Sequence, residues 1–74
     1  MKRSPANQAL GRTVRSAREQ SGYSQEAFAA HAGLDRANYG AIERGEFNVS
    51  VDTLVKIAAG LDISVGDLFR RASL

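Results

Sequence analysis

The sequence predicts an all-α protein, and three observations lead to that prediction. No stretch of the 74 residues shows the sustained alternation of polar and β-branched residues that marks a half-buried strand. Apolar residues spaced by three and four positions recur along the whole chain. Residues that favour helix N-termini, and residues that tolerate a left-handed backbone, separate these segments at short intervals. Together these patterns divide the chain into five short helices.

The first predicted helix lies between Pro5 and Gly22. Ser4 can cap its N-terminus, and Pro5 suits the first helical position because its fixed φ is helical and an N–H there would have no partner. Gly22 can adopt the left-handed backbone that commonly ends a helix. The stripe expected to face the core comprises Leu10, Val14 and Ala17.

Two shorter helices are predicted next, one between Ser24 and Gly33 and one between Asp35 and Gly45. Ser24 and Asp35 have side-chain oxygens that can cap a helix, and both glycines can end one. Glu26 adds a negative charge at the positive end of the first helix dipole. The apolar residues expected to face inward are Phe28, Ala29, Ala32, Tyr39 and Ile42.

The last two predicted helices follow Ser50 and Ser64, each of which can act as an N-cap. Asp62 tolerates the left-handed conformation and can end the fourth helix. Ser64, with Asp67 three residues later, approximates a capping box for the fifth. The inward residues of these two helices are expected to be Leu54, Ile57, Ala58, Leu61, Val65, Leu68 and Phe69.

Composition limits the chain to one small domain. Its 43% hydrophobic content can form a single core, and the lack of cysteine, which excludes disulfides and thiolate metal sites, fits the cytoplasm. No apolar run approaches the length of a membrane span. We expect a flexible basic arm at residues 1–6, with Lys2 and Arg3, ahead of a domain at residues 7–74.

Charge is distributed unevenly along the chain. Residues 1–24 contain five Lys or Arg and one acid, a net charge of +4, whereas residues 25–74 contain five basic and seven acidic residues, a net charge of −2. A basic first third suits a polyanionic partner, although a solvated helix face would look the same.

The second and third predicted helices have the features of a helix-turn-helix. Ala29 and the turn at Gly33 allow two helices to cross closely, and the third helix has a small, polar outer face with little to bury. On these features alone, a generic small helical bundle remains the alternative.

The order of residues adds a resemblance to a known family. The run from Ser21 to Phe69 resembles the phage-repressor/Cro-like (XRE-type) helix-turn-helix family through its SQE start, AG turn, IERG end and final DLF. Within it, LDRxxxxxIERGxxNxS is similar to the small controller proteins of restriction-modification systems. The resemblance implies a five-helix bundle of the lambda-repressor-like DNA-binding type and a sequence-specific, double-stranded DNA-binding transcriptional regulator.

The resemblance also implies a recognition helix at residues 35–44 that enters the major groove. Arg36 has the chemistry to contact O6 and N7 of guanine, and Asn38 has the chemistry to contact N6 and N7 of adenine. Base contacts are expected from Arg36, Ala37, Asn38 and Ala41. Phosphate contacts are expected from Ser24, Gln25, the Tyr39 hydroxyl, Arg44, Asn48 and Ser50.

Two further sets of residues are expected to have structural roles, in an internal ion pair and in a dimer interface. Arg18 and Glu43 match positions that pair beneath the surface in the family, so the resemblance assigns them to an internal ion pair. One small module contacts only a few base pairs, so specificity in a genome needs two modules, and the resemblance implies a symmetric homodimer on a palindromic operator. Its interface is expected to involve Ile63, Val65, Phe69 and Leu74.

Catalysis is not expected, because the sequence offers no nucleophile with a base, no paired carboxylates and no phosphate-binding loop. No metal, cofactor or small-molecule ligand is expected either; His31 has no second ligand four residues later and is expected to be solvated. The alternative function is a protein-interaction module, such as an antitoxin-type partner of a toxin. RNA binding is disfavoured, because no aromatic stacking platform is evident.

Overall fold

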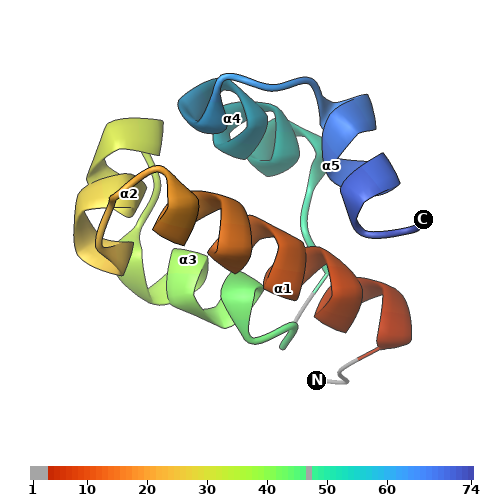
Figure 1. Cartoon of the computed structure of the whole chain (residues 1–74). Helices are drawn as coiled ribbons and strands as arrows, with labels where there is room; N and C mark the ends of the chain where they lie inside the picture. The colour runs from red at the N-terminus through yellow and green to blue at the C-terminus, as the bar shows by residue number, and fades with distance from the viewer. Residues whose placement is uncertain (1–3, 47) are drawn as a thin grey trace.

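The computed structural model describes residues 4–46 and 48–74 (Figure 1). This part of the chain folds into five helices joined by loops and contains no strand. This arrangement confirms the predicted all-α class. In chain order the helices are α1 (Pro5–Gln20), α2 (Gln25–Ala32), α3 (Arg36–Glu43), α4 (Val51–Leu61) and α5 (Val65–Arg71).

Each helix begins one residue after a side chain that caps it. In every case the cap oxygen accepts a hydrogen bond from the backbone N–H three residues later, which satisfies one of the free donors of the first turn. The five caps are Ser4, Ser24, Asp35, Ser50 and Ser64. Ser64 also forms the full capping box with Asp67, as the sequence predicts.

Left-handed residues end four of the helices at the predicted positions. Gly33 and Asp62 are the C-caps of α2 and α4, with φ of 74° and 62°. Gly22 and Gly45, with φ of 83° and 71°, lie just beyond the ends of α1 and α3. The sequence therefore located the helix boundaries to within one or two residues.

Residues 4–6 of the expected N-terminal arm belong to the start of α1. Ser4 caps α1, and Pro5 and Ala6 lie in its first turn, because proline suits that position. Lys2 and Arg3 lie outside the described residues, as does Phe47.

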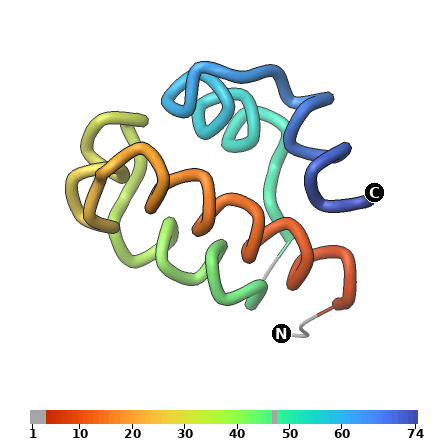
Figure 2. The backbone as a smooth tube through the Cα atoms, in the orientation of Figure 1, coloured from red at the N-terminus to blue at the C-terminus, as the bar shows by residue number. Residues whose placement is uncertain are grey.

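The long helix α1 runs between two groups of helices (Figures 1 and 2). It packs on α3 along one flank and on α5 along another, while α2 packs on α3 and α4. The core between them contains Leu10, Val14, Phe28, Ala29, Tyr39, Ile42, Leu54, Ile57, Ala58 and Leu68. None of the described helices is both long and apolar enough to span a membrane.

Gly11 is the point of closest approach between α1 and α3. A Cβ atom at this position would lie only 2.5 Å from the carbonyl oxygens of Ile42 and Glu43. The bare backbone of α1 thus rests directly on the last turn of α3, and this contact sets how deeply α3 sits in the bundle. Gly11 was not predicted from the sequence to be a contact between helices.

Candidate nucleic-acid interface

The outer face of α3 presents a small set of exposed side chains. Arg36, Ala37 and Asn38 are exposed in the first turn, and Ala41 is half-buried one turn later. The Asp35 carboxylate accepts a hydrogen bond from the backbone N–H of Asn38, which fixes this turn. The side-chain amide of Asn38 stays exposed and can contact a partner. Within residues 4–46 and 48–74, the Arg36 guanidinium takes part in no ion pair and no hydrogen bond.

A hollow of about 450 Å³ adjoins this face, between α3 and the start of α2. Its lining residues are Gln25, Asp35, Arg36, Ala37, Gly40 and Arg44. Gly40 forms part of the wall: a Cβ there would lie 3.2 Å from Nη1 of Arg44 and 3.4 Å from Oε1 of Gln25. Two arginines and one carboxylate line the hollow, and Glu46, which pairs with Arg44, lies outside this lining. The lining is therefore net positive and suits an anionic group next to α3.

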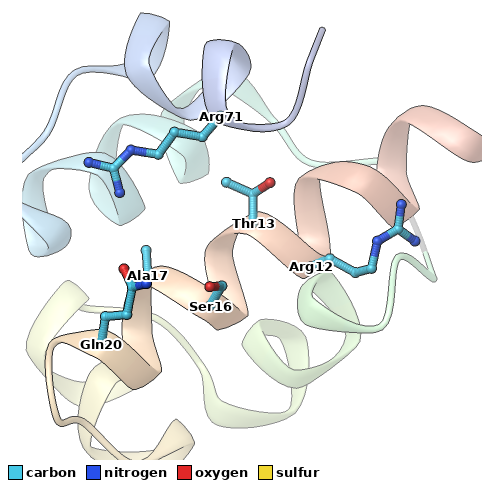
Figure 3. A pocket seen from close by; sticks show the side chains of 6 residues that line it. All are labelled: Arg12, Thr13, Ser16, Ala17, Gln20 and Arg71. Carbon is cyan, nitrogen blue, oxygen red and sulfur yellow. The ribbon is translucent and has the colours of Figure 1, made fainter.

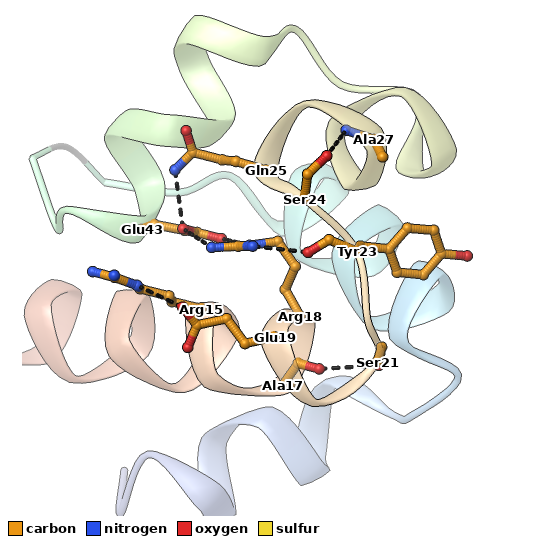
Figure 4. Close-up of polar contacts among 10 residues, drawn as sticks. All are labelled: Arg15, Ala17, Arg18, Glu19, Ser21, Tyr23, Ser24, Gln25, Ala27 and Glu43. Atoms are coloured by element: carbon orange, nitrogen blue, oxygen red, sulfur yellow. Dashed lines mark hydrogen bonds and ion pairs between the residues drawn. The ribbon is translucent and has the colours of Figure 1, made fainter.

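A buried network adjoins the hollow through Gln25, which lines the hollow and belongs to the network (Figure 4). Nε of Arg18 donates to Oε2 of Glu43 at 2.7 Å, and Nη2 of Arg18 donates to Oε1 at 3.2 Å. Nη1 of Arg18 donates to the carbonyl of Tyr23 at 2.9 Å, and Nε2 of Gln25 donates to Oε1 of Glu43 at 3.0 Å. The Glu43 carboxylate therefore links α3 to α1 and α2 and holds Gln25 at the edge of the hollow, and Arg18 links α1 to the α1–α2 loop.

The Glu43 carboxylate is kept ionised by this network. Burial raises the pKa of Glu43, but the hydrogen bonds from Arg18 and Gln25, together with the nearby Tyr39 hydroxyl, lower it below its usual value. A depressed pKa in the folded state adds stability above the unfolded pKa of glutamate, about 4.3, and that stability is lost as the pH falls through the folded pKa.

We therefore expect the unfolding free energy of the wild type to fall more steeply than that of Glu43→Gln as the pH drops from about 5 to 3. Urea denaturation at several pH values measures both curves. Glu19→Gln is the matched control, because Glu19 forms an exposed ion pair with Arg15, and its curve should follow that of the wild type. Parallel curves for wild type and Glu43→Gln would contradict the expectation.

Comparison with known sequences shows the family to which this chain belongs. The sequence profile of the helix-turn-helix family matches residues 14–68, most of the chain. The chain belongs to the helix-turn-helix family. Its α2, the Gly33 turn and α3 are the elements for which the family is named.

Controller proteins are among the relatives of this helix-turn-helix chain. Control protein C.MunI of Mycoplasma sp is 50% identical over 52 residues, which is 70% of this chain and 70% of the relative. Control protein C.SmaI of Serratia marcescens is 42% identical over 65 residues, 88% of this chain and 77% of the relative.

A solved structure is similar as well. The restriction-modification controller protein C.AhdI from Aeromonas hydrophila is 41% identical, covers 85% of this chain and 96% of its own, and superposes with a TM-score of 0.82. The family and these relatives support a DNA-binding transcriptional regulator, which is not an enzyme.

One expected contact of this helix-turn-helix is wrong. Tyr39 is 0% exposed, and its ring packs on Phe28 with centroids 5.3 Å apart, so its hydroxyl does not reach a phosphate. The hydroxyl is buried without a well-formed hydrogen bond in the described part of the chain. Burial raises the pKa of Tyr39, and Glu43 raises it further. The large ring points inward because position 39 lies on the face of α3 that meets the core.

Ser24 and Ser50 serve as caps in this structure. Oγ of Ser24 accepts the backbone N–H of Ala27, and Oγ of Ser50 accepts that of Thr53 and donates to its Oγ1 at 2.9 Å. Both serines remain exposed at helix N-termini, where free backbone N–H groups point outward.

Arg44 and Asn48 have internal partners that the sequence did not predict. Nε of Arg44 lies 3.0 Å from a carboxylate oxygen of Glu46. Oδ1 of Asn48 accepts from Nδ2 of Asn7 at 2.7 Å, which joins the loop before α4 to the start of α1. Both side chains are exposed on the surface.

The residues expected at a dimer interface differ in exposure. Leu74 is 55% exposed, whereas Ile63, Val65 and Phe69 are partly buried against the core of their own domain. Two other apolar side chains, Val51 and Val55, are 72% and 51% exposed on α4. This exposed pair was not predicted from the sequence; its signal was the one-turn spacing of the two valines, outside the inward stripe.

Proposed function

We propose that this helix-turn-helix protein reads a specific sequence in double-stranded DNA by placing α3 in the major groove. The main support is Arg36, an exposed guanidinium at the start of α3 that has no internal partner in the described part of the chain. Its positive charge lies at the positive end of the helix dipole, so nothing within α3 favours its presence there. A partner with acceptor groups, such as the edge of a guanine, supplies what the domain lacks.

Base contacts are assigned to the outer face of α3. Arg36 donates both arms of its guanidinium to O6 and N7 of guanine, and Asn38 pairs with N6 and N7 of adenine. Ala37 and Ala41 have the small side chains that let the helix backbone approach the base edges, or a thymine methyl group.

Phosphate contacts are assigned to the rim of the recognition face. Gln25, held by Glu43, and Arg44 flank the net positive hollow, where a phosphate oxygen would accept from the Arg44 guanidinium and from free backbone N–H groups at the start of α2. Ser24, Asn48 and Ser50 add donors at helix starts and in the loop before α4. These contacts set the register of α3 in the groove, because phosphates contain no sequence information.

We propose that two copies act together as a homodimer on a palindromic operator. One domain reads only a few base pairs, and a two-fold axis places two α3 helices about 34 to 36 Å apart on one face of the duplex. The exposed Leu74 is the apolar side chain at the C-terminal end that is available for such a contact, and Val51 and Val55 extend the available apolar surface on α4.

The experiment that tests the proposal is selection of bound sequences from random duplexes by the purified protein, followed by titration of the recovered site at two salt concentrations. A recovered palindrome, bound much more tightly than bulk DNA, supports the dimeric sequence reader. Weak, salt-sensitive binding without a preferred sequence contradicts it, because phosphate attraction alone produces that behaviour.

On the recovered site, Arg36→Ala is expected to lose about 1 to 3 kcal/mol of discrimination at one base pair in each half-site. The reason is that alanine cannot replace the two hydrogen bonds to guanine. Competition binding between the recovered site and the site with that base pair changed measures the loss. Lys56→Ala, which removes an exposed cation from α4, should leave the discrimination unchanged.

A further inference from the structure

A second hollow lies away from the recognition face, between α1 and α5 (Figure 3). Its volume is about 400 Å³. Five of its lining residues come from α1 and recur at one-turn intervals, and the sixth comes from α5. These residues are Arg12, Thr13, Ser16, Ala17, Gln20 and Arg71. Small side chains line the middle of the row, so they leave a space between α1 and α5 that larger side chains would fill.

Apart from Ala17, the residues that line this hollow are cations or polar residues with hydrogen-bond donors, and none is acidic. Arg12 and Arg71 are exposed and take part in no ion pair or hydrogen bond within the described residues. Their neighbours Arg15 and Arg70 differ, because each is paired with an acid on its own helix. Thr13 and Ser16 add hydroxyls between the two free arginines.

The shape of the hollow suits an extended chain. Arg12 and Gln20 are eight residues apart on α1, so the row is about 12 Å long at 1.5 Å per residue. About four residues of extended peptide span that length. Figure 3 shows Arg71 reaching from α5 on the side of Ala17 and Gln20, with Arg12 at the other end of the row.

We propose that the α1–α5 hollow binds an extended acidic segment of a partner protein, with Arg12 and Arg71 each holding one carboxylate. Guanidinium groups bind carboxylates through paired, charge-assisted hydrogen bonds, and the hydroxyls between them can donate to the peptide backbone. A duplex on α3 leaves this hollow open, because α3 and α5 pack on different flanks of α1 and the two hollows share no lining residue. The proposed peptide site is therefore separate from the DNA-binding face.

The hollow also stays clear of the side chains assigned to the dimer. Phe69 and Arg71 are two positions apart on α5, and residues at that spacing point to different sides of a helix. The partly buried Phe69 packs on the core while Arg71 lines the hollow. A dimer formed through the C-terminal residues would thus present two such hollows.

A labelled hexaglutamate peptide tests the proposal, with hexaglutamine as the uncharged control. Titrated into isotope-labelled protein, hexaglutamate should shift the amide signals of residues 12–20 and of the last turn of α5, and hexaglutamine should not. The double variant Arg12→Gln/Arg71→Gln should bind at least about fivefold more weakly by fluorescence anisotropy, because two charged pairs are removed. Shifts confined to α3 and the start of α2 would overturn the proposal, since they would place the peptide in the DNA site.

Two controls separate this site from general attraction to positive charge. Arg15→Gln removes an exposed arginine of α1 that does not line the hollow, and it should change peptide affinity less than twofold. An equal loss in Arg15→Gln would overturn the proposal. Adding a DNA duplex should leave peptide binding unchanged, whereas displacement by DNA would assign the two arginines to phosphate contact and would likewise overturn it. Thermal unfolding of each variant verifies that the fold is retained.

Discussion

Glu43→Ala is expected to lower the free energy of unfolding by about 3 to 5 kcal/mol. The variant leaves the buried Arg18 guanidinium without the carboxylate that accepts two of its hydrogen bonds, and it removes the acceptor for Gln25. Breaking one side of a buried pair costs far more than the pair adds, because the remaining charge stays out of water. Urea denaturation at pH 7, followed by circular dichroism, measures the loss.

The matched control is Glu19→Ala, which breaks the exposed pair with Arg15 on the surface of α1. Exposed pairs one turn apart contribute about 0.3 to 0.5 kcal/mol, so the control should unfold close to the wild type. If Glu43→Ala lay within the same range as Glu19→Ala, the network would have no structural role. A domain of this size has only a few kcal/mol in reserve, so the variant is also expected to be partly unfolded at 37 °C.

Gly11→Ala is expected to destabilise the protein by about 1 to 3 kcal/mol, although alanine favours helix. The added methyl group would lie 2.5 Å from two backbone carbonyl oxygens of α3, and backbone cannot rotate away as a long side chain can. The helices must separate, and α3 must move in relation to α1. The midpoint of urea unfolding measures the effect on stability, and affinity for the selected duplex measures the effect on the position of α3.

Gly66→Ala isolates the clash from the change in helix propensity. A Cβ at Gly66 would meet its nearest atoms at 3.5 and 3.6 Å, both on side chains, which is ordinary contact. Both variants gain the propensity of alanine, about 0.5 to 1 kcal/mol in a helix, so only Gly11→Ala should be destabilised. A neutral or stabilising Gly11→Ala would mean that α1 and α3 can adjust without cost.

Glu43→Ala and Gly11→Ala both act on the packing of α1 against α3, which we call the α1–α3 joint. Gly11 sets the distance between α1 and α3, and the Arg18–Glu43 pair sets their register. Glu43 also holds Gln25 beside the recognition face, so the interior of the domain and the proposed phosphate contact share one carboxylate. Loss of DNA affinity in variants of this joint should therefore accompany loss of stability.

The sequence by itself determined the class, the helix boundaries and the family. Capping is a local interaction: a cap oxygen reaches an N–H three residues away, and a glycine that follows a helix can adopt a left-handed backbone without the steric cost of a Cβ. That is why Ser24, Asp35 and Gly33 could be assigned to helix ends before any coordinates. The spacing of apolar residues is equally local, so it identified most of the core.

Only the tertiary structure decided what those helices place together. Tyr39 faces the core, Gln25 donates to Glu43, and Gly11 touches the last turn of α3; each fact depends on residues 11 or more positions away. The sequence also could not show that Arg12 and Arg71 line one hollow, because they lie on opposite ends of the chain. Distances between helices arise from how side chains and backbones pack, and that packing is a property of the whole domain, with no counterpart in any short stretch of sequence.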